Sequence, residues 1–153
     1  MHTSVEETVQ ARLILSAHRS VRLRVTLGYR REDPLAVRMG FPAEFSLDEP
    51  GDGAGPGSGR DASRDAGPDI EWVFARQLLS AGLELAAGDG DVHVRPAPGR
   101  RTMVELRAAE GTALVRFDTA DLRRFLWHSR LVVPEGEEHR HLDADRALAE
   151  LLG

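Results

Sequence analysis

Residues 21–30, VRLRVTLGYR, alternate between apolar and polar side chains along their whole length. The odd positions are valine, leucine, valine, leucine and tyrosine, whereas arginine, threonine and glycine occupy the even ones. This period of two predicts a β-strand with one face on a core and the other in solvent. Residues 9–17 alternate in the same way, with only Ile14 as an exception, so a polar turn at residues 18–20 is expected to join the two strands into an antiparallel hairpin.

The same signal predicts further strands along the chain. Residues 33–41 begin with the turn dipeptide Asp33-Pro34 and then alternate again. Trp72 is expected in the core, because its strand must join the two halves of the sheet. Four more strands are predicted: one that contains Trp72 and Phe74, one that contains Val92 and Val94, and the two at residues 102–108 and 112–118. A tight turn ending at Gly111 joins the strands at residues 102–108 and 112–118.

Three helices complete the prediction. Residues 75–83 favour a short helix with Gly82 as its C-cap. An amphipathic helix is expected from a cap at Asp118 or Thr119, with Leu122, Phe125 and Leu126 on its apolar face, and a last helix from Asp143. The order of elements predicts a single α+β domain over residues 1–153, built on an antiparallel sheet of about seven strands.

Residues 48–69 carry almost no side chain suited to a core and are rich in glycine, proline, serine and aspartate. They predict a flexible loop inside the domain. The net charge of −5 disfavours a general nucleic-acid binder, and the lack of cysteine excludes disulfides and thiolate metal sites. With no signal peptide and no long apolar run, the chain is expected in the cytoplasm.

Four segments together resemble, in order, the pattern of the SsgA-like proteins, a family of sporulation and cell-division regulators of actinomycetes. They are DPLAV, EWVFARQLLSAGL, GDGDVHVRP and VPEGEEHRHLDADRALAELL. The residues that carry the resemblance are Asp33, Pro34, Trp72, Phe74, Arg76, Gly82, Gly90, Pro134, His141 and Asp143. Residues 48–69 are longer than the family pattern, and Gln77 stands where glutamate is frequent.

The resemblance implies a whirly-like fold, a homotrimer and a location at the division septum. It further implies a non-enzymatic regulator or adaptor that takes part in septum-site selection or wall remodelling. Its partners would be FtsZ or other divisome or SsgA-like proteins, with no small-molecule substrate and no cofactor. A whirly-type single-stranded nucleic-acid-binding protein is the alternative function.

In the segment HRHLDAD, the alternating residues His139, His141, Asp143 and Asp145 have side chains that can ligate a metal ion. The competing interpretation makes Asp143 the N-cap of the last helix and Asp145 part of its first turn. We favour the helix start and predict no metal. No serine stands in a nucleophile-elbow setting, and GDGDV lacks the helix that follows a phosphate loop, so an enzyme is not expected.

Arginines gather on the outward face of the first hairpin. The expected turn places Arg12 near Arg24, with Arg22 and Arg30 on the same face. Solvent and the nearby Glu6 or Glu7 would offset their repulsion, or the face would bind an acidic peptide, another subunit or nucleic acid. On the long helix, Trp127 beside Arg123 is either an interface anchor or packed against Leu131. The candidate protein-interaction surface is therefore Arg12, Arg22, Arg24, Arg30, Arg123 and Trp127.

Overall fold

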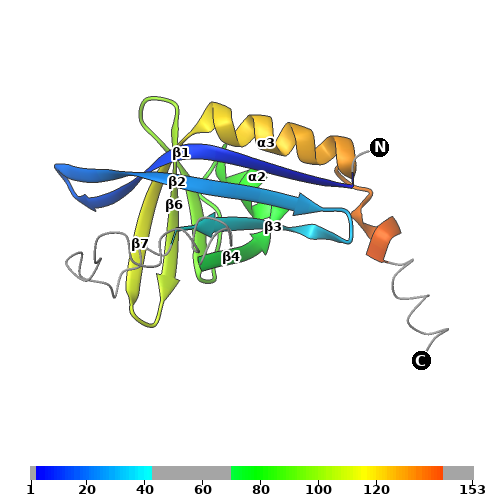
Figure 1. Cartoon of the computed structure of the whole chain (residues 1–153), viewed down its shortest axis with the longest axis horizontal. Helices are drawn as coiled ribbons and strands as arrows, with labels where there is room; N and C mark the ends of the chain where they lie inside the picture. Colours follow the sequence, from blue (N-terminus) through cyan, green and yellow to red (C-terminus); the bar gives the residue numbers. More distant parts are fainter. Residues whose placement is uncertain (1–2, 43–69, 143–153) are drawn as a thin grey trace, which may run out of the picture.

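In the computed structural model, which describes residues 3–42 and 70–142, the strands form one curled antiparallel sheet in the order β4-β3-β2-β1-β7-β6-β5 (Figure 1). The α+β class and the seven-stranded antiparallel sheet are confirmed, and the whirly-like comparison stays a prediction. The strands are β1 (Ser4–Ser16), β2 (Arg19–Arg30), β3 (Asp33–Phe41), β4 (Ile70–Ala75), β5 (Val92–Ala97), β6 (Arg101–Ala108) and β7 (Gly111–Asp118). The predicted loop at residues 48–69 lies outside the described residues.

The β1–β2 hairpin follows the predicted alternation, and its apolar side chains build the centre of the core. Leu23, Val25, Leu27 and Tyr29 are all at most 2% exposed. The hairpin turns at residues 17–18, earlier than expected. In the resulting register Arg12 is directly opposite Arg22, and Arg24, which was expected near Arg12, is its diagonal neighbour on the same face. Near the tip, Leu15 is 50% exposed, since the end of the hairpin projects beyond the core (Figure 1).

Strands β1 and β7 join the two halves of the sheet, with Ala11 opposite Phe117 and Leu13 opposite Val115. The expectation that the strand of Trp72 makes this connection is wrong, because β4 pairs with β3 at one edge of the sheet. The predicted position of the turn before β3 is also wrong. The turn lies at residues 31–32, and Asp33 and Pro34 already belong to the strand.

Helices α2 (Arg76–Gly82) and α3 (Thr119–Val132) pack on the core side of the sheet. The predicted apolar face of α3 is confirmed, because Leu122, Phe125 and Leu126 are at most 1% exposed. The predicted side-chain caps of α3 are wrong. The carboxylate of Asp118 pairs with Arg101, and the hydroxyl of Thr119 is hydrogen-bonded to Thr102.

Another predicted helix end differs from the structure. Gly82 is the last residue of α2 and not its C-cap, which is Leu83. Residues 138–142 form a helical turn that the sequence pattern did not predict, whereas the predicted last helix from Asp143 lies outside the described residues. A helical path also separates His139 and His141, because residues two apart lie on different sides of a helix.

Candidate functional site

Arg76, one of the residues that carry the family resemblance, is buried at the start of α2 with 4% of its surface exposed. Its Nη1 donates to the carbonyl oxygens of Ser129 and Val133, at 3.2 and 2.9 Å, and to the Ser129 hydroxyl at 3.2 Å. Its Nη2 donates to Oε2 of Glu138 at 2.6 Å. One guanidinium thus satisfies carbonyl groups at the end of α3 and fixes the segment that follows the helix.

Tyr29 lies under this guanidinium. The Cζ atom of Arg76 is 4.6 Å from the centre of the tyrosine ring, a cation–π contact. The Tyr29 hydroxyl donates to the carbonyl oxygen of Pro34 at 2.9 Å. Burial raises the pKa of Tyr29 to about 12, although the positive charge of Arg76 opposes the shift. We call Arg76, Glu138, Ser129, Tyr29 and Pro34 the Arg76 cluster.

Glu138 is held as a carboxylate in this cluster. Its burial alone would raise its pKa, but the hydrogen bond from Arg76 and backbone N–H donors, that of Gly136 among them, outweigh burial and lower the pKa below 4.5. The cluster therefore joins β2, β3, α2, α3 and the segment after α3 by charged and neutral hydrogen bonds. Because none of the buried side-chain nitrogen and oxygen atoms among the described residues lacks a hydrogen-bond partner, the cluster acts as a structural clamp.

The single tyrosine of the chain makes the clamp directly measurable. The native protein is expected to show no tyrosinate absorbance at pH 10, the ordinary tyrosine pKa, and to ionise only near about 12. The folded state favours the neutral phenol, so this contribution to stability is complete below pH 10 and is lost as the pH rises through 12. Ultraviolet titration with circular dichroism on the same samples tests this. A midpoint near 10 in protein that is still folded would contradict the buried placement.

The other residues of the resemblance that the structure describes lie in separate local surroundings. Asp33 accepts a hydrogen bond from Arg38 at 3.1 Å. Gly82 lies against Val94, where no side chain fits, whereas Gly90 faces open space. Pro134 is exposed after α3, and His141 is half-buried on the helical turn. Only Pro34 and Arg76 of this set belong to the Arg76 cluster, and the functional importance of the others stays a prediction.

The outward face of α3 carries an exposed ridge of Arg123, Trp127 and Leu131. A spacing of four residues places these side chains on one side of the helix. Trp127 is 60% and Leu131 is 64% exposed. Arg123 pairs with Glu84 at 3.2 Å. Of the two interpretations of Trp127, the structure supports the exposed one, and we call these three residues the α3 ridge.

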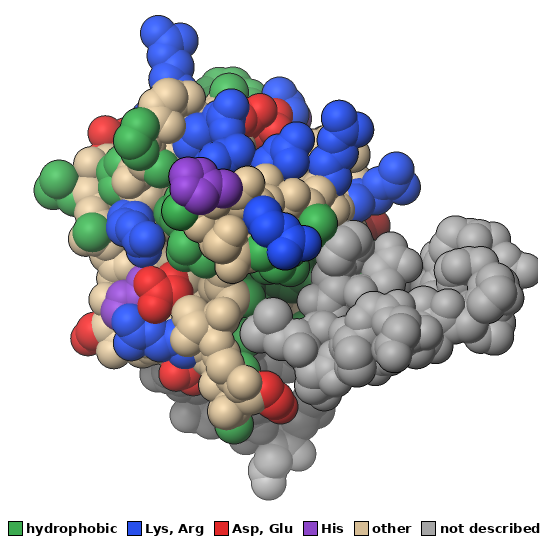
Figure 2. Space-filling model, turned by 90° about the vertical axis from the view of Figure 1, so that its left-hand side faces the viewer, with side chains coloured by type: hydrophobic (Ala, Val, Ile, Leu, Met, Phe, Trp, Pro, Cys, Tyr) green, Lys and Arg blue, Asp and Glu red, His purple; other side chains and the backbone are tan. Residues whose placement is uncertain are grey.

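The hairpin arginines lie on a different surface, because β1 and β2 turn their even-numbered residues away from the core and from α3. Arg12 is directly opposite Arg22, whereas Arg24 faces Gln10 and Arg30 faces Ser4 at the far end of the hairpin. The candidate interaction residues are thus distributed over two surfaces. Figure 2, which faces the projecting tip of the hairpin, shows arginine side chains gathered over the upper part of this side.

Neither nearby glutamate neutralises these arginines. Glu7 faces the core side, where its carboxylate contacts Nδ1 of His128 on α3. Glu6 is opposite Gly28, away from Arg12 and Arg22. On the other side of β1, Arg12 is opposite Arg116 of β7. Arg116 was not part of the sequence prediction, because only the pairing of β1 with β7 brings it to this face.

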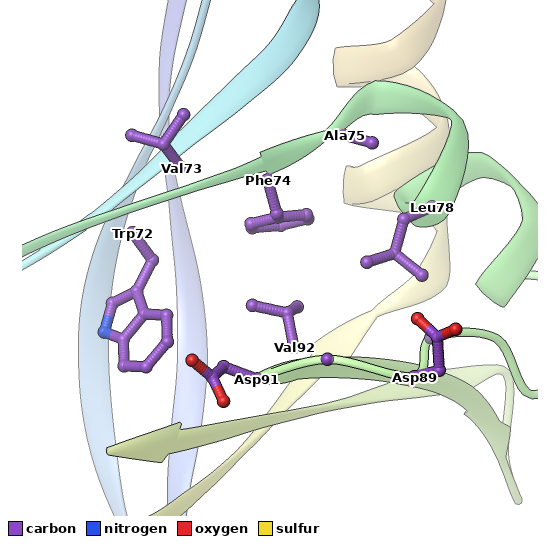
Figure 3. Close-up of a pocket in the computed structure, with 10 residues that line it drawn as sticks. Trp72, Val73, Phe74, Ala75, Leu78, Asp89, Asp91 and Val92 are labelled. Atoms are coloured by element: carbon purple, nitrogen blue, oxygen red, sulfur yellow. The ribbon is translucent and has the colours of Figure 1, made fainter. Parts of the chain in front are cut away.

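A cleft of about 800 Å³ separates the two edges of the curled sheet. Phe74 of β4 and Val92 of β5 point toward each other across it, and Asp89 and Asp91 line its rim (Figure 3). Trp72 points into the open end of the cleft and is partly buried against the core, so its predicted core position is confirmed only in part. The two carboxylates make this rim unsuitable for the phosphate that the GDGDV segment suggested.

Within residues 3–42 and 70–142, no three His, Asp or Glu side chains gather as metal ligands would. Two members of the hypothetical metal quartet, Asp143 and Asp145, lie outside these residues. The described helices include none that is both long and apolar enough to cross a membrane.

Comparison with known proteins identifies the family. The family model described as "Streptomyces sporulation and cell division protein, SsgA" matches residues 23–138. The chain belongs to the SsgA family. It is 35% identical to the sporulation-specific cell division protein SsgB of Kineococcus radiotolerans over 98% of this chain and 81% of the relative. It is 32% identical to SsgB of Streptomyces coelicolor, over 99% and 98% of the two chains.

Solved structures of SsgA family members have the same fold. One, described by the words "Mutations in SsgB correlate to longitudinal cell division during sporulation of Streptomyces coelicolor", superposes with a TM-score of 0.72 at 32% identity, over 91% of this chain and 95% of the other. The crystal structure of the SsgA-like sporulation-specific cell division protein of Thermobifida fusca gives a TM-score of 0.74 at 30% identity, over 97% and 95%. The nucleic-acid alternative gains no support from these relatives.

Proposed function

We propose that this chain is a non-enzymatic adaptor of sporulation-specific cell division that acts by protein–protein contacts at the division septum. The support is its membership of the SsgA family, whose curated relatives are named as sporulation-specific cell division proteins and not as enzymes. Septum-site selection and recruitment of FtsZ or wall-remodelling proteins are the activities we assign to it within that process.

The α3 ridge is the observation that carries the proposed mode of action. Trp127 and Leu131 expose large apolar surface beside the charged Arg123, as tryptophan and arginine anchors do at the centres of protein interfaces. The opposite face of the same helix is fixed in the core by Leu122, Phe125 and Leu126. A rigid helix therefore presents the ridge, so little conformational entropy is lost when a partner binds.

Assembly into a homotrimer would strengthen the binding of a partner protein whose contact with each single α3 ridge is weak. Three identical ridges give each further contact a high effective concentration once the first has formed. A polymerising partner such as FtsZ, or another SsgA-like protein, offers the repeated sites that such an assembly needs. Light scattering of the purified chain measures the assembly state, and a monomer would remove this part of the proposal.

Trp127→Ala tests the adaptor function in a sporulating actinomycete that depends on this chain. We expect a folded variant that places septa irregularly, because truncating an anchor residue weakens an interface by about 2 kcal/mol or more, roughly 30-fold. Fluorescence microscopy of septa and capture of FtsZ by the purified variant are the measurements. Leu35→Ala, an exposed leucine on β3, is the matched control and should leave both unchanged. Normal septation with Trp127→Ala would contradict the role of the ridge.

A further inference from the structure

We propose that the outer face of the sheet carries a binding site for a carboxylate-rich segment of a partner protein, an inference that rests on the proposed adaptor function and adds a second surface to it. Three arginines form a row across neighbouring strands. Arg22 of β2 is opposite Arg12 of β1, and Arg12 is opposite Arg116 of β7. Adjacent strands lie only about 4.8 Å apart, so the row concentrates positive charge.

This row is unfavourable in the isolated chain. Like charges directly opposed across strands destabilise a sheet. Arg12 donates to the Ser20 hydroxyl at 3.1 Å, but this oxygen carries no charge. Among the described residues, no carboxylate lies within ion-pair distance of Arg22 or Arg116. Although the chain has a net charge of −5, its described residues supply no carboxylate to Arg22 or Arg116, which indicates that a ligand supplies the negative charge.

The surface is hollowed where the row lies. A depression of about 310 Å³ is lined by Arg12, Arg22 and Arg116, and by Arg101, Gln10 and Asp118. Asp118 is already paired with Arg101, with its Oδ1 at 3.1 Å from Nε. Four guanidinium groups and one carboxylate leave the lining with a net charge of +3 (4 − 1). Guanidinium groups bind carboxylates and phosphates through paired hydrogen bonds, so the depression fits an anion with several negative groups.

The neighbouring side chains favour a peptide over a nucleic acid. Ile14 of β1, Leu114 of β7 and Met103 of β6 are half-buried on the same outer face, and Met103 is opposite Arg116. No outward-facing residue of β1, β2, β6 or β7 is aromatic, so bases would find no stacking surface. Arginines flanked by aliphatic side chains suit an extended segment that mixes acidic and aliphatic residues.

Fluorescence anisotropy of the full chain with a short labelled peptide of glutamate and leucine tests the site. We expect saturable binding at low ionic strength that weakens as salt is added. Arg22→Gln and Arg116→Gln should each weaken it about tenfold or more, the loss expected for a charge-assisted hydrogen bond. Arg124→Gln, an exposed arginine on α3, is the control and should bind as the unmodified chain does. A peptide with glutamine in place of glutamate should not bind.

Thermal unfolding separates a binding role from a structural one. Because Arg116→Gln removes a repulsive contact, the melting temperature of this variant should equal or exceed that of the unmodified chain. If Arg116 instead stabilised the fold, its replacement would lower the melting temperature.

Absence of peptide binding at low salt, unchanged binding by Arg116→Gln, or tighter binding of oligothymidine than of the peptide would each overturn the proposal. If the peptide does not bind but Trp127→Ala still disturbs septation, only the outer-face site is lost. Peptide binding without any effect of the chain on septation would remove the adaptor function instead.

Discussion

Replacing Arg76 by alanine is expected to lower the free energy of unfolding by about 3 kcal/mol, the lower end of the range for breaking a buried ion pair. The change leaves the Glu138 carboxylate and the carbonyl oxygens of Ser129 and Val133 without their donor. The lower end applies because Glu138 keeps 16% of its side chain in contact with water. Urea unfolding followed by circular dichroism measures the loss.

A surface arginine provides the matched control. Arg95 pairs with Glu105 at 3.3 Å, but 42% of its side chain is exposed. Its replacement by alanine should therefore change stability by at most about 0.5 kcal/mol. Equal losses for Arg76→Ala and Arg95→Ala would show that the Arg76 cluster does not clamp the fold.

Acid provides a second check on the same cluster. Because the folded protein lowers the pKa of Glu138, the ion pair stabilises the fold above pH 4.5, and this stability is lost as the pH falls below that value. Glu138→Gln removes the titrating group. The difference in stability between the unmodified chain and this variant should therefore be largest near neutral pH and shrink in acid. A difference that is constant from neutral pH to pH 3, about one unit below the ordinary value, would contradict the charged pair.

Gly82→Ala is expected to cost about 1–3 kcal/mol, as inserted atoms do in a packed core. A Cβ at this position would lie 2.3 Å from Cγ1 of Val94 and 2.9 Å from its carbonyl oxygen. Since a backbone oxygen cannot rotate away as a side chain can, α2 and β5 must separate. The measurement is the midpoint of thermal unfolding, which should fall, and the apolar surface exposed between α2 and β5 should bind more of a hydrophobic dye.

Gly90→Ala controls for the loss of glycine itself. A Cβ there meets no atom within 4 Å, and the backbone conformation is one that other residues adopt. Its effect should stay within about 0.5 kcal/mol, the usual range for surface substitutions. A Gly82→Ala variant as stable as Gly90→Ala would mean that α2 and β5 are not packed as closely as the structure has them.

Most of the fold could be predicted from the sequence because the strands are buried on one face. The alternation in residues 21–30 is sufficient to identify β2 and its core side. Turn positions were less predictable, since several polar residues at the hairpin tip suit a turn equally well. The turn that forms places Arg12 directly opposite Arg22, with Arg24 as its diagonal neighbour.

The candidate sites depend on contacts that no local pattern specifies. Arg76 stands in an apolar segment, which is a signal of burial, but its partners Ser129 and Glu138 are 53 and 62 residues away. Arg116 reaches the arginine row only through the pairing of β1 with β7. The ridge was easier to predict, because Trp127 lies off the apolar stripe of its own helix.

The position of the Arg76 clamp along the chain has a consequence for the order of folding. Arg76 emerges from the ribosome long before Glu138, because 62 residues separate them. During that interval the guanidinium has neither its carboxylate nor the end of α3, and burying it alone would be costly. The core around Tyr29 therefore closes only after residues 129–138, which hold the partners of Arg76, have been synthesised. This long-range dependence favours slow, cooperative folding over the stepwise addition of finished segments.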